Sequence, residues 1–251
     1  MIELTSGDGH SFTAYRADPS ETPKGAVVVL QDYSGLSERI QKEVDKFAAR
    51  GYVSIAPALF DRQKKASSIG EAEGRELASE ATVDLVLQDI QTAVDAVKSA
   101  GKVALVGYSW GGYLAYLSAN SLHDIACTIG YYAAGVTERR SDKRRAPTLL
   151  HFPEADPTVS SSERDQFRAI RPDVSTFVYP SAQIGFNFDG GEGFDAAAAE
   201  SAQERTFFWI SQFVEGQPPV LLKNAGAYAQ AKAEKKKKKS SASDDMGPPM
   251  D

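Results

Sequence analysis

The chain has 251 residues, of which 42% are hydrophobic and 25% charged, which is enough for one α/β domain to bury its own core. No stretch approaches the roughly 18 consecutive apolar residues that a membrane span needs, and Met1–Leu4 lack the basic and apolar segments of a secretion signal, so we expect a cytosolic protein. Cys127 is the only cysteine, which excludes an internal disulfide and paired-cysteine metal or redox sites.

Charge is distributed unevenly along the chain. Residues 223–251 hold seven lysines and four acidic residues, and the remaining 21 basic and 30 acidic residues give residues 1–222 a net charge of −9. A body of this charge repels phosphate backbones, which argues against nucleic acid as its main partner.

The C-terminal segment differs in composition from the rest of the chain. Residues 223–251 are rich in Lys, Ala, Ser and Pro and offer too little apolar surface to offset the entropy of ordering. We predict a folded domain over residues 1–222 and a disordered tail over 223–251. The lysine run Lys235–Lys239 suits an interaction module for nucleic acid or an anionic membrane surface, but a solvated tail is the simpler interpretation.

Short apolar runs alternate with amphipathic segments along the body. An antiparallel hairpin is predicted around Gly7–Gly9 from the alternating residues 2–4 and 11–15. Six further strands are predicted over residues 26–30, 53–56, 103–106, 127–131, 148–152 and 175–179. Helices are predicted over about 37–50, 81–99, 111–120, 160–170 and 195–213. This alternation predicts an α/β fold, with a mostly parallel central sheet that has helices on both faces.

The strongest motif is Gly107-Tyr108-Ser109-Trp110-Gly111, a Gly-x-Ser-x-Gly sequence between a predicted strand and a predicted helix. This context is typical of the nucleophile elbow of the α/β-hydrolase fold. Small residues are needed at 107 and 111 because the tight turn brings backbones close together. The alternative is a tight turn without a catalytic role.

Other residues fit a hydrolytic site around Ser109. The backbone N–H groups of Trp110 and Tyr33 are candidate oxyanion donors, at the helix start and in the loop after the 26–30 strand. Asp156, just past a late strand, is the candidate triad acid. A carboxylate that caps the following helix is the alternative for Asp156, and Glu154 is the weaker candidate acid.

The chain resembles the dienelactone hydrolase family over roughly residues 1–216. The resemblance rests on six segments in the family's order: 31–36, 51–60, 107–112, 130–132, 151–156 and 179–186. It implies a single-domain α/β-hydrolase with few lid insertions that acts on small esters or lactones. It also implies an acidic residue near the nucleophile, here Asp32, and places Tyr131 in the pocket. We expect no cofactor and no metal, and a monomer is plausible.

The sequence departs from the family pattern at two places. All three histidines, His10, His123 and His151, precede Asp156, whereas this fold orders its triad as nucleophile, acid and then histidine. The family's histidine motif aligns with residues 179–186, so Ile184 stands at the histidine position. Phe188 stands where some members carry an arginine for a substrate carboxylate, so an anionic substrate is not predicted.

Two hypotheses therefore remain from the sequence. The first is a hydrolase of small esters or lactones that uses Ser109, with Asp156 and a relocated base. His151 is a candidate for that base, although packing within its strand is the simpler interpretation, and Asp32 is a poor base for a hydroxyl proton unless burial raises its basicity. The second is a catalytically silent relative that binds a small molecule or a protein partner in the same cleft, which Ile184 and Phe188 both make more apolar.

Overall fold

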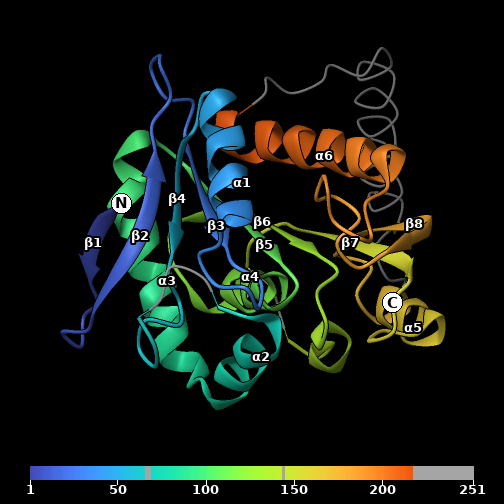
Figure 1. The fold of residues 1–251 in the computed structure, drawn as a ribbon. Helices are drawn as coiled ribbons and strands as arrows, with labels where there is room; N and C mark the ends of the chain where they lie inside the picture. The colour runs from blue at the N-terminus through green and yellow to red at the C-terminus, as the bar shows by residue number, and fades with distance from the viewer. Residues whose placement is uncertain (66–68, 143–144, 217–251) are drawn as a thin grey trace, which may run out of the picture. The chain divides into compact units, whose positions relative to one another are not determined.

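A computed structural model describes residues 1–65, 69–142 and 145–216. Residues 1–216 form one compact unit (Figure 1). The predicted tail, with Lys235–Lys239, lies outside the described residues. The description that follows concerns the unit of residues 1–216.

One sheet of eight strands organises this unit, in the order β1-β2-β4-β3-β5-β6-β7-β8. The strands are β1 (Ile2–Thr5), β2 (Ser11–Ala17), β3 (Ala26–Leu30), β4 (Val53–Pro57), β5 (Val103–Tyr108), β6 (Ile125–Tyr131), β7 (Thr148–Ala155) and β8 (Ser175–Gln183). Strands β3 to β8 run parallel, whereas β2 is antiparallel to both β1 and β4. The predicted α/β-hydrolase fold with a mostly parallel sheet is confirmed.

Helices cover both faces of the sheet (Figure 1). They are α1 (Glu38–Ala49), α2 (Glu71–Glu80), α3 (Val83–Val97), α4 (Trp110–Ser121), α5 (Ser161–Ile170) and α6 (Ala196–Ile210). Short 3₁₀ turns cover Lys98–Ala100 and Val136–Arg139, and a π-helical turn, Ser211–Glu215, continues α6. Helices α1 and α6 pack on one face, and α3 and α4 pack on the other.

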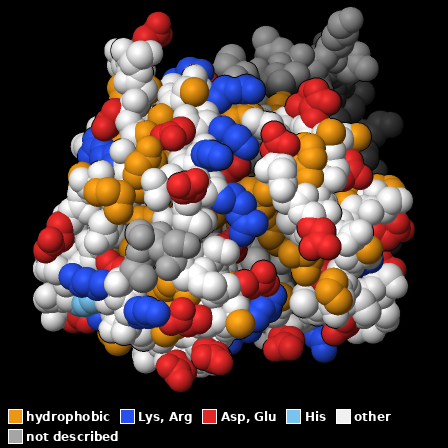
Figure 2. Space-filling view, viewed as in Figure 1, with side chains coloured by type: hydrophobic (Ala, Val, Ile, Leu, Met, Phe, Trp, Pro, Cys, Tyr) orange, Lys and Arg blue, Asp and Glu red, His pale blue; other side chains and the backbone are white. Residues whose placement is uncertain are grey.

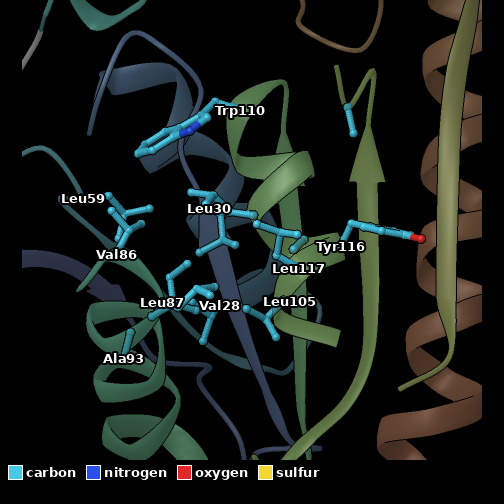
Figure 3. Packing of buried hydrophobic residues seen from close by; sticks show 14 of the residues in the cluster. Val28, Leu30, Leu59, Val86, Leu87, Ala93, Leu105, Trp110, Tyr116 and Leu117 are labelled. Carbon is cyan, nitrogen blue, oxygen red and sulfur yellow. The ribbon is translucent and has the colours of Figure 1, made fainter. Parts of the chain in front are cut away.

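The alternation of side chains along each strand divides the core into two layers. Val28 and Leu30 of β3 pack with α3 and α4, in the layer shown in Figure 3. Val27 and Val29 of the same strand pack with α1 and α6. All four side chains are fully buried, and burial of each such side chain contributes about 1.5–3 kcal/mol. Strands apolar at consecutive positions are therefore covered on both sides, as the sequence predicted.

Helix α2 is the element that the sequence analysis missed. Its ten residues, EAEGRELASE, bury only Gly74 and form no apolar stripe. The periodicity that predicts helices therefore has nothing to detect here. Helix α2 is placed instead by close contact, because a Cβ at Gly74 would lie 1.7 Å from the carbonyl oxygen of Tyr33. The helix thus rests on the loop that follows β3.

The surface of the described residues is mixed in charge. Figure 2 shows acidic and basic side chains interspersed over the face seen in Figure 1, with smaller apolar areas between them. In the described ranges no helix is both long and apolar enough to cross a bilayer.

The packing of α2 predicts an unusual response to substitution at Gly74. Alanine in place of glycine inside a helix normally stabilises by about 1 kcal/mol. We expect Gly74→Ala to destabilise instead, by about 1–3 kcal/mol, because its Cβ has to displace the Tyr33 backbone. Urea unfolding measures the difference. Gly70→Ala is the matched control, since a Cβ there meets no atom within 4 Å; a stabilised Gly74→Ala protein would contradict the described contact.

Candidate active site

Ser109 lies in a strained turn between β5 and α4. Its backbone angles are φ 52° and ψ −115°, a conformation that non-glycine residues rarely adopt. The turn is held by close packing: a Cβ at Gly107 would lie 2.0 Å from the carbonyl oxygen of Gly111, and a Cβ at Gly111 would lie 2.3 Å from that of Leu30. The Ser109 N–H donates to the Tyr131 carbonyl oxygen at 2.9 Å. This is the geometry that a nucleophile elbow requires.

The turn opens into a cleft at the carboxyl ends of the parallel strands. Strand β3 leads through α1 to β4 on one side, whereas β5 leads through α4 to β6 on the other side. The order in which the chain adds strands to the sheet therefore reverses between the parallel strands β3 and β5. Ligands of open α/β sheets bind at such a switch point. The cleft measures about 210 Å³, and Ser109, Asp32, Tyr33, Ile184 and Phe188 are among its lining residues.

The two candidate oxyanion donors flank Ser109. Trp110 is the first residue of α4, and the first N–H groups of a helix have no partner within the helix. Its indole stacks on Phe60, with ring centroids 4.9 Å apart, which anchors the helix start. Tyr33 lies in the loop after β3 and lines the cleft. The N-terminal end of α4, which carries the positive end of the helix dipole, therefore begins at Ser109 in the cleft.

Asp156 follows β7 and does not cap α5. One carboxylate oxygen, Oδ1, accepts from the Thr158 N–H at 2.8 Å and from the Thr158 hydroxyl at 2.6 Å. The other, Oδ2, is buried and has no hydrogen-bond partner. Helix α5 is capped by Ser160 and Glu163 in a capping box, so the capping alternative for Asp156 is wrong. Its Oδ2 is thus a buried acceptor without a donor.

Ile184 follows β8 directly, as Asp156 follows β7. Ala155, the last residue of β7, pairs with Gln183, the last residue of β8, so the two segments leave the sheet at adjacent points. Ile184 lines the cleft with Ser109. The position that the family resemblance assigns to the histidine thus faces the cleft, and an isoleucine there transfers no proton.

Two guanidinium groups line the same cleft, and the sequence analysis found neither. Arg39, from α1, pairs with Asp32 and lies over the Phe188 ring, 4.1 Å from its centroid. Asp32 also accepts from the Ser34 N–H at 2.8 Å. Phe188, at the position where some family members carry an arginine, thus supports an arginine that comes from another element.

The second guanidinium comes from α2. Arg75 lies over the Tyr33 ring, 4.4 Å from its centroid, and bonds Glu71 at 2.7 Å. Both residues line the cleft. No motif marks Arg39 or Arg75 in the sequence, because their helices reach the cleft only through the tertiary fold.

The sequence placed Tyr131 in the pocket, and the structure corrects this to Tyr132. Tyr131 ends β6, and its side chain lines a separate cavity of about 30 Å³ together with Tyr108. Its hydroxyl bonds the Thr206 hydroxyl at 2.6 Å. Tyr132 has a positive φ of 37° and lines the Ser109 cleft. Adjacent residues at a strand end point to opposite sides, so a one-residue offset moves the side chain to another cavity.

None of the three histidines lines the cleft. His151 is fully buried in β7, where Nδ1 bonds the Tyr179 hydroxyl at 2.7 Å and Nε2 bonds the Thr206 hydroxyl at 3.1 Å. Burial, with a smaller effect of Arg205, lowers the pKa of His151 to about 3. His10 stacks on Phe12 in the β1–β2 hairpin, and His123 is exposed after α4. The interpretation of His151 as a relocated base is therefore not supported by its position.

Within the described ranges, no group of three or more His, Cys, Asp or Glu residues is arranged to hold a metal ion.

A serine in a strained strand-to-helix turn at the switch point of this sheet is the arrangement of the α/β-hydrolase fold. The model of the dienelactone hydrolase family matches residues 12–214, and the chain belongs to that family. Membership of the family supports a hydrolase function. Carboxymethylenebutenolidase of Pseudomonas putida is 25% identical over 232 residues, with 86% of this chain and 98% of the relative covered. A putative carboxymethylenebutenolidase of Yersinia pestis is 29% identical, with 81% and 85% covered.

Solved structures agree on the fold. A putative dienelactone hydrolase from Klebsiella pneumoniae superposes with a TM-score of 0.75 at 23% identity, covering 84% of this chain and 99% of that one. A dienelactone hydrolase-like promiscuous phosphotriesterase from metagenomic libraries gives a TM-score of 0.68 at 18% identity, with 84% and 97% covered.

The burial of His151 predicts a specific acid sensitivity. Below pH 6.5 the unfolded chain binds a proton at this histidine, whereas the folded chain does so only near pH 3. The free energy of unfolding therefore keeps its full value above pH 6.5 and decreases as the pH is lowered further. The decrease due to His151 is about 2 kcal/mol between pH 7 and pH 5. Urea unfolding at both pH values measures this loss. We expect His151→Gln to lose less on acidification than the parent, and exposed His123→Gln to match the parent; equal losses in all three proteins would contradict it.

Proposed function

We propose that this protein cleaves small esters or lactones with Ser109 as its nucleophile. The observation that carries the proposal is the strained Ser109 turn at the start of α4, inside the cleft. Backbone strain of this kind costs about 1–3 kcal/mol and persists where the surrounding packing imposes it. The glycine contacts at 107 and 111 impose it here.

In the proposed reaction the Ser109 hydroxyl oxygen attacks the substrate carbonyl carbon. The backbone N–H groups of Trp110 and Tyr33 stabilise the oxyanion that develops. Asp156 is the acid that would orient a base, but Ile184 occupies the position of that base. Without a member of the triad, an oxyanion hole and substrate binding still supply about 10³ to 10⁴-fold acceleration over water. We therefore expect slow turnover.

The second candidate is a catalytically silent relative that binds a small molecule or a protein partner in the cleft. It is favoured by Ile184, which lines the cleft, and by the unpartnered Oδ2 of Asp156. In this hypothesis the turn at Ser109 is retained for folding alone, and its hydroxyl has no covalent chemistry.

A covalent probe separates the two candidates. We expect a fluorophosphonate to label the protein at one site, because its fluoride departs readily and Ser109 is exposed to the cleft; intact-protein mass spectrometry measures the increment. Ser109→Ala should remove the label, and Ser118→Ala, a serine buried in α4 away from the cleft, should keep it. No labelling of the parent, together with no hydrolysis of p-nitrophenyl acetate, would sink the enzymatic proposal.

Restoring the base tests the role of position 184. We expect Ile184→His to raise kcat/KM for p-nitrophenyl acetate by about 100-fold or more, the usual contribution of a positioned general base. Ile184→Asn is the control for added polarity without basicity and should change little. The double variant Ile184→His with Asp156→Asn should lose most of the gain, because in this proposal Asp156 orients the introduced imidazole. An unchanged rate in Ile184→His would mean that side chain 184 does not reach Ser109.

A further inference from the structure

The missing base has a consequence for which bonds Ser109 can break. In a complete triad the histidine takes the serine proton and then delivers it to the leaving group. Around Ser109 that position holds Ile184, and the cleft, as lined by described residues, contains no imidazole. The leaving group therefore receives no proton as its bond to the acyl carbon breaks. It has to depart as an anion.

The carboxylates of the cleft do not replace the histidine. Asp32 is engaged by Arg39 and by the Ser34 N–H, and Glu71 is engaged by Arg75. Glu192, the third carboxylate that lines the cleft, is exposed to solvent. Carboxylates are much weaker bases than an imidazole, so they are poorly matched to the proton of a serine hydroxyl, and an ionised carboxylate has no proton to give to a leaving group.

The same cleft holds two guanidinium groups, each paired with a carboxylate, that carry no transferable proton. Arg39 and Arg75 both line it, each stacked on an aromatic ring of the wall, Phe188 and Tyr33 respectively. A guanidinium remains protonated at every working pH, so it stabilises an anion without acting as an acid. The aromatic walls offer an apolar surface for a flat leaving group.

From these contacts, and resting on the proposed function, we infer that Ser109 takes acyl groups from aryl esters and thioesters and holds them as a long-lived acyl-enzyme. Phenols and thiols, with pKa values of about 10 and 8.5, leave readily as anions, whereas alkyl alcohols are about as weakly acidic as water and leave poorly without a proton. The cleft thus selects substrates by the acidity of the leaving group.

The reaction balances in two steps. The Ser109 oxygen forms a bond to the acyl carbon while the bond from that carbon to the phenolate or thiolate breaks, and the hydroxyl proton passes to solvent. Water then attacks the acyl carbon, which releases the carboxylic acid and returns the serine. The second step needs both a base for the water and a proton for the serine oxygen, so it is the slower one.

The test is a leaving-group series on the full chain. With p-nitrophenyl acetate we expect a burst of about one p-nitrophenolate per protein followed by a slow steady rate, and a mass increase of one acetyl group on Ser109. Phenyl acetate should acylate more slowly, and ethyl acetate at least about 100-fold more slowly than p-nitrophenyl acetate, because general acid assistance is absent. Ser109→Ala should show neither the burst nor the acetyl adduct at this position.

Two variants test the roles assigned to Arg39 and to position 184. Arg39→Gln should slow acylation by phenyl acetate more than by p-nitrophenyl acetate, since the more basic leaving anion depends more on nearby positive charge. Ile184→His should remove the burst and narrow the gap between phenyl and ethyl acetate, because it restores a proton donor.

The outcomes separate this inference from the proposed function. Steady turnover without a burst, or acylation by ethyl acetate at the rate of the aryl esters, overturns the acyl-enzyme inference and leaves Ser109 as the nucleophile. Absence of any adduct on Ser109, from the aryl esters and from the fluorophosphonate alike, overturns both.

Discussion

The close packing of β3, β5 and the start of α4 is the constraint on which the site depends. Gly107 and Gly111 leave no room for a Cβ, because carbonyl oxygens of Gly111 and Leu30 occupy that space. The chain therefore passes from strand to helix without side chains at those two positions, and Ser109 adopts its strained backbone. This turn is imposed by the backbone and does not depend on the residue at position 184. The strained conformation of Ser109 therefore forms with an isoleucine there.

The fold was largely predictable because its signals are local. Buried strands such as β3 and β5 are continuous apolar runs, and α3 carries a regular apolar stripe. Helix α2 gave no such signal, since its position follows from the contact between Gly74 and the Tyr33 carbonyl, residues far apart in the sequence. Strands β7 and β8 also extend beyond the predicted ends at residues 152 and 179, to Ala155 and Gln183. The prediction stopped short because most of the added residues are exposed and lack the apolar pattern.

The site was predictable only where a motif fixes the backbone. Ser109 and Tyr33 line the cleft, and both were named from strand and turn patterns. Tyr132 was missed by one residue, because pattern alone does not decide which of two adjacent tyrosines faces the cleft. Arg39 and Arg75 were missed for another reason: a basic side chain on a helix is usually solvated, and only the fold shows that these two lie on aromatic rings beside Ser109.

The surroundings of Asp156 bear on the proposed site, because this residue is the candidate acid. A buried polar atom without a partner costs about 1–3 kcal/mol, and the Oδ2 of Asp156 is such an atom. The carboxylate is held in place by Thr158 through its other oxygen, so its orientation does not depend on a histidine. The proposal that a restored base would raise activity rests on this acceptor, because local backbone structure already fixes it.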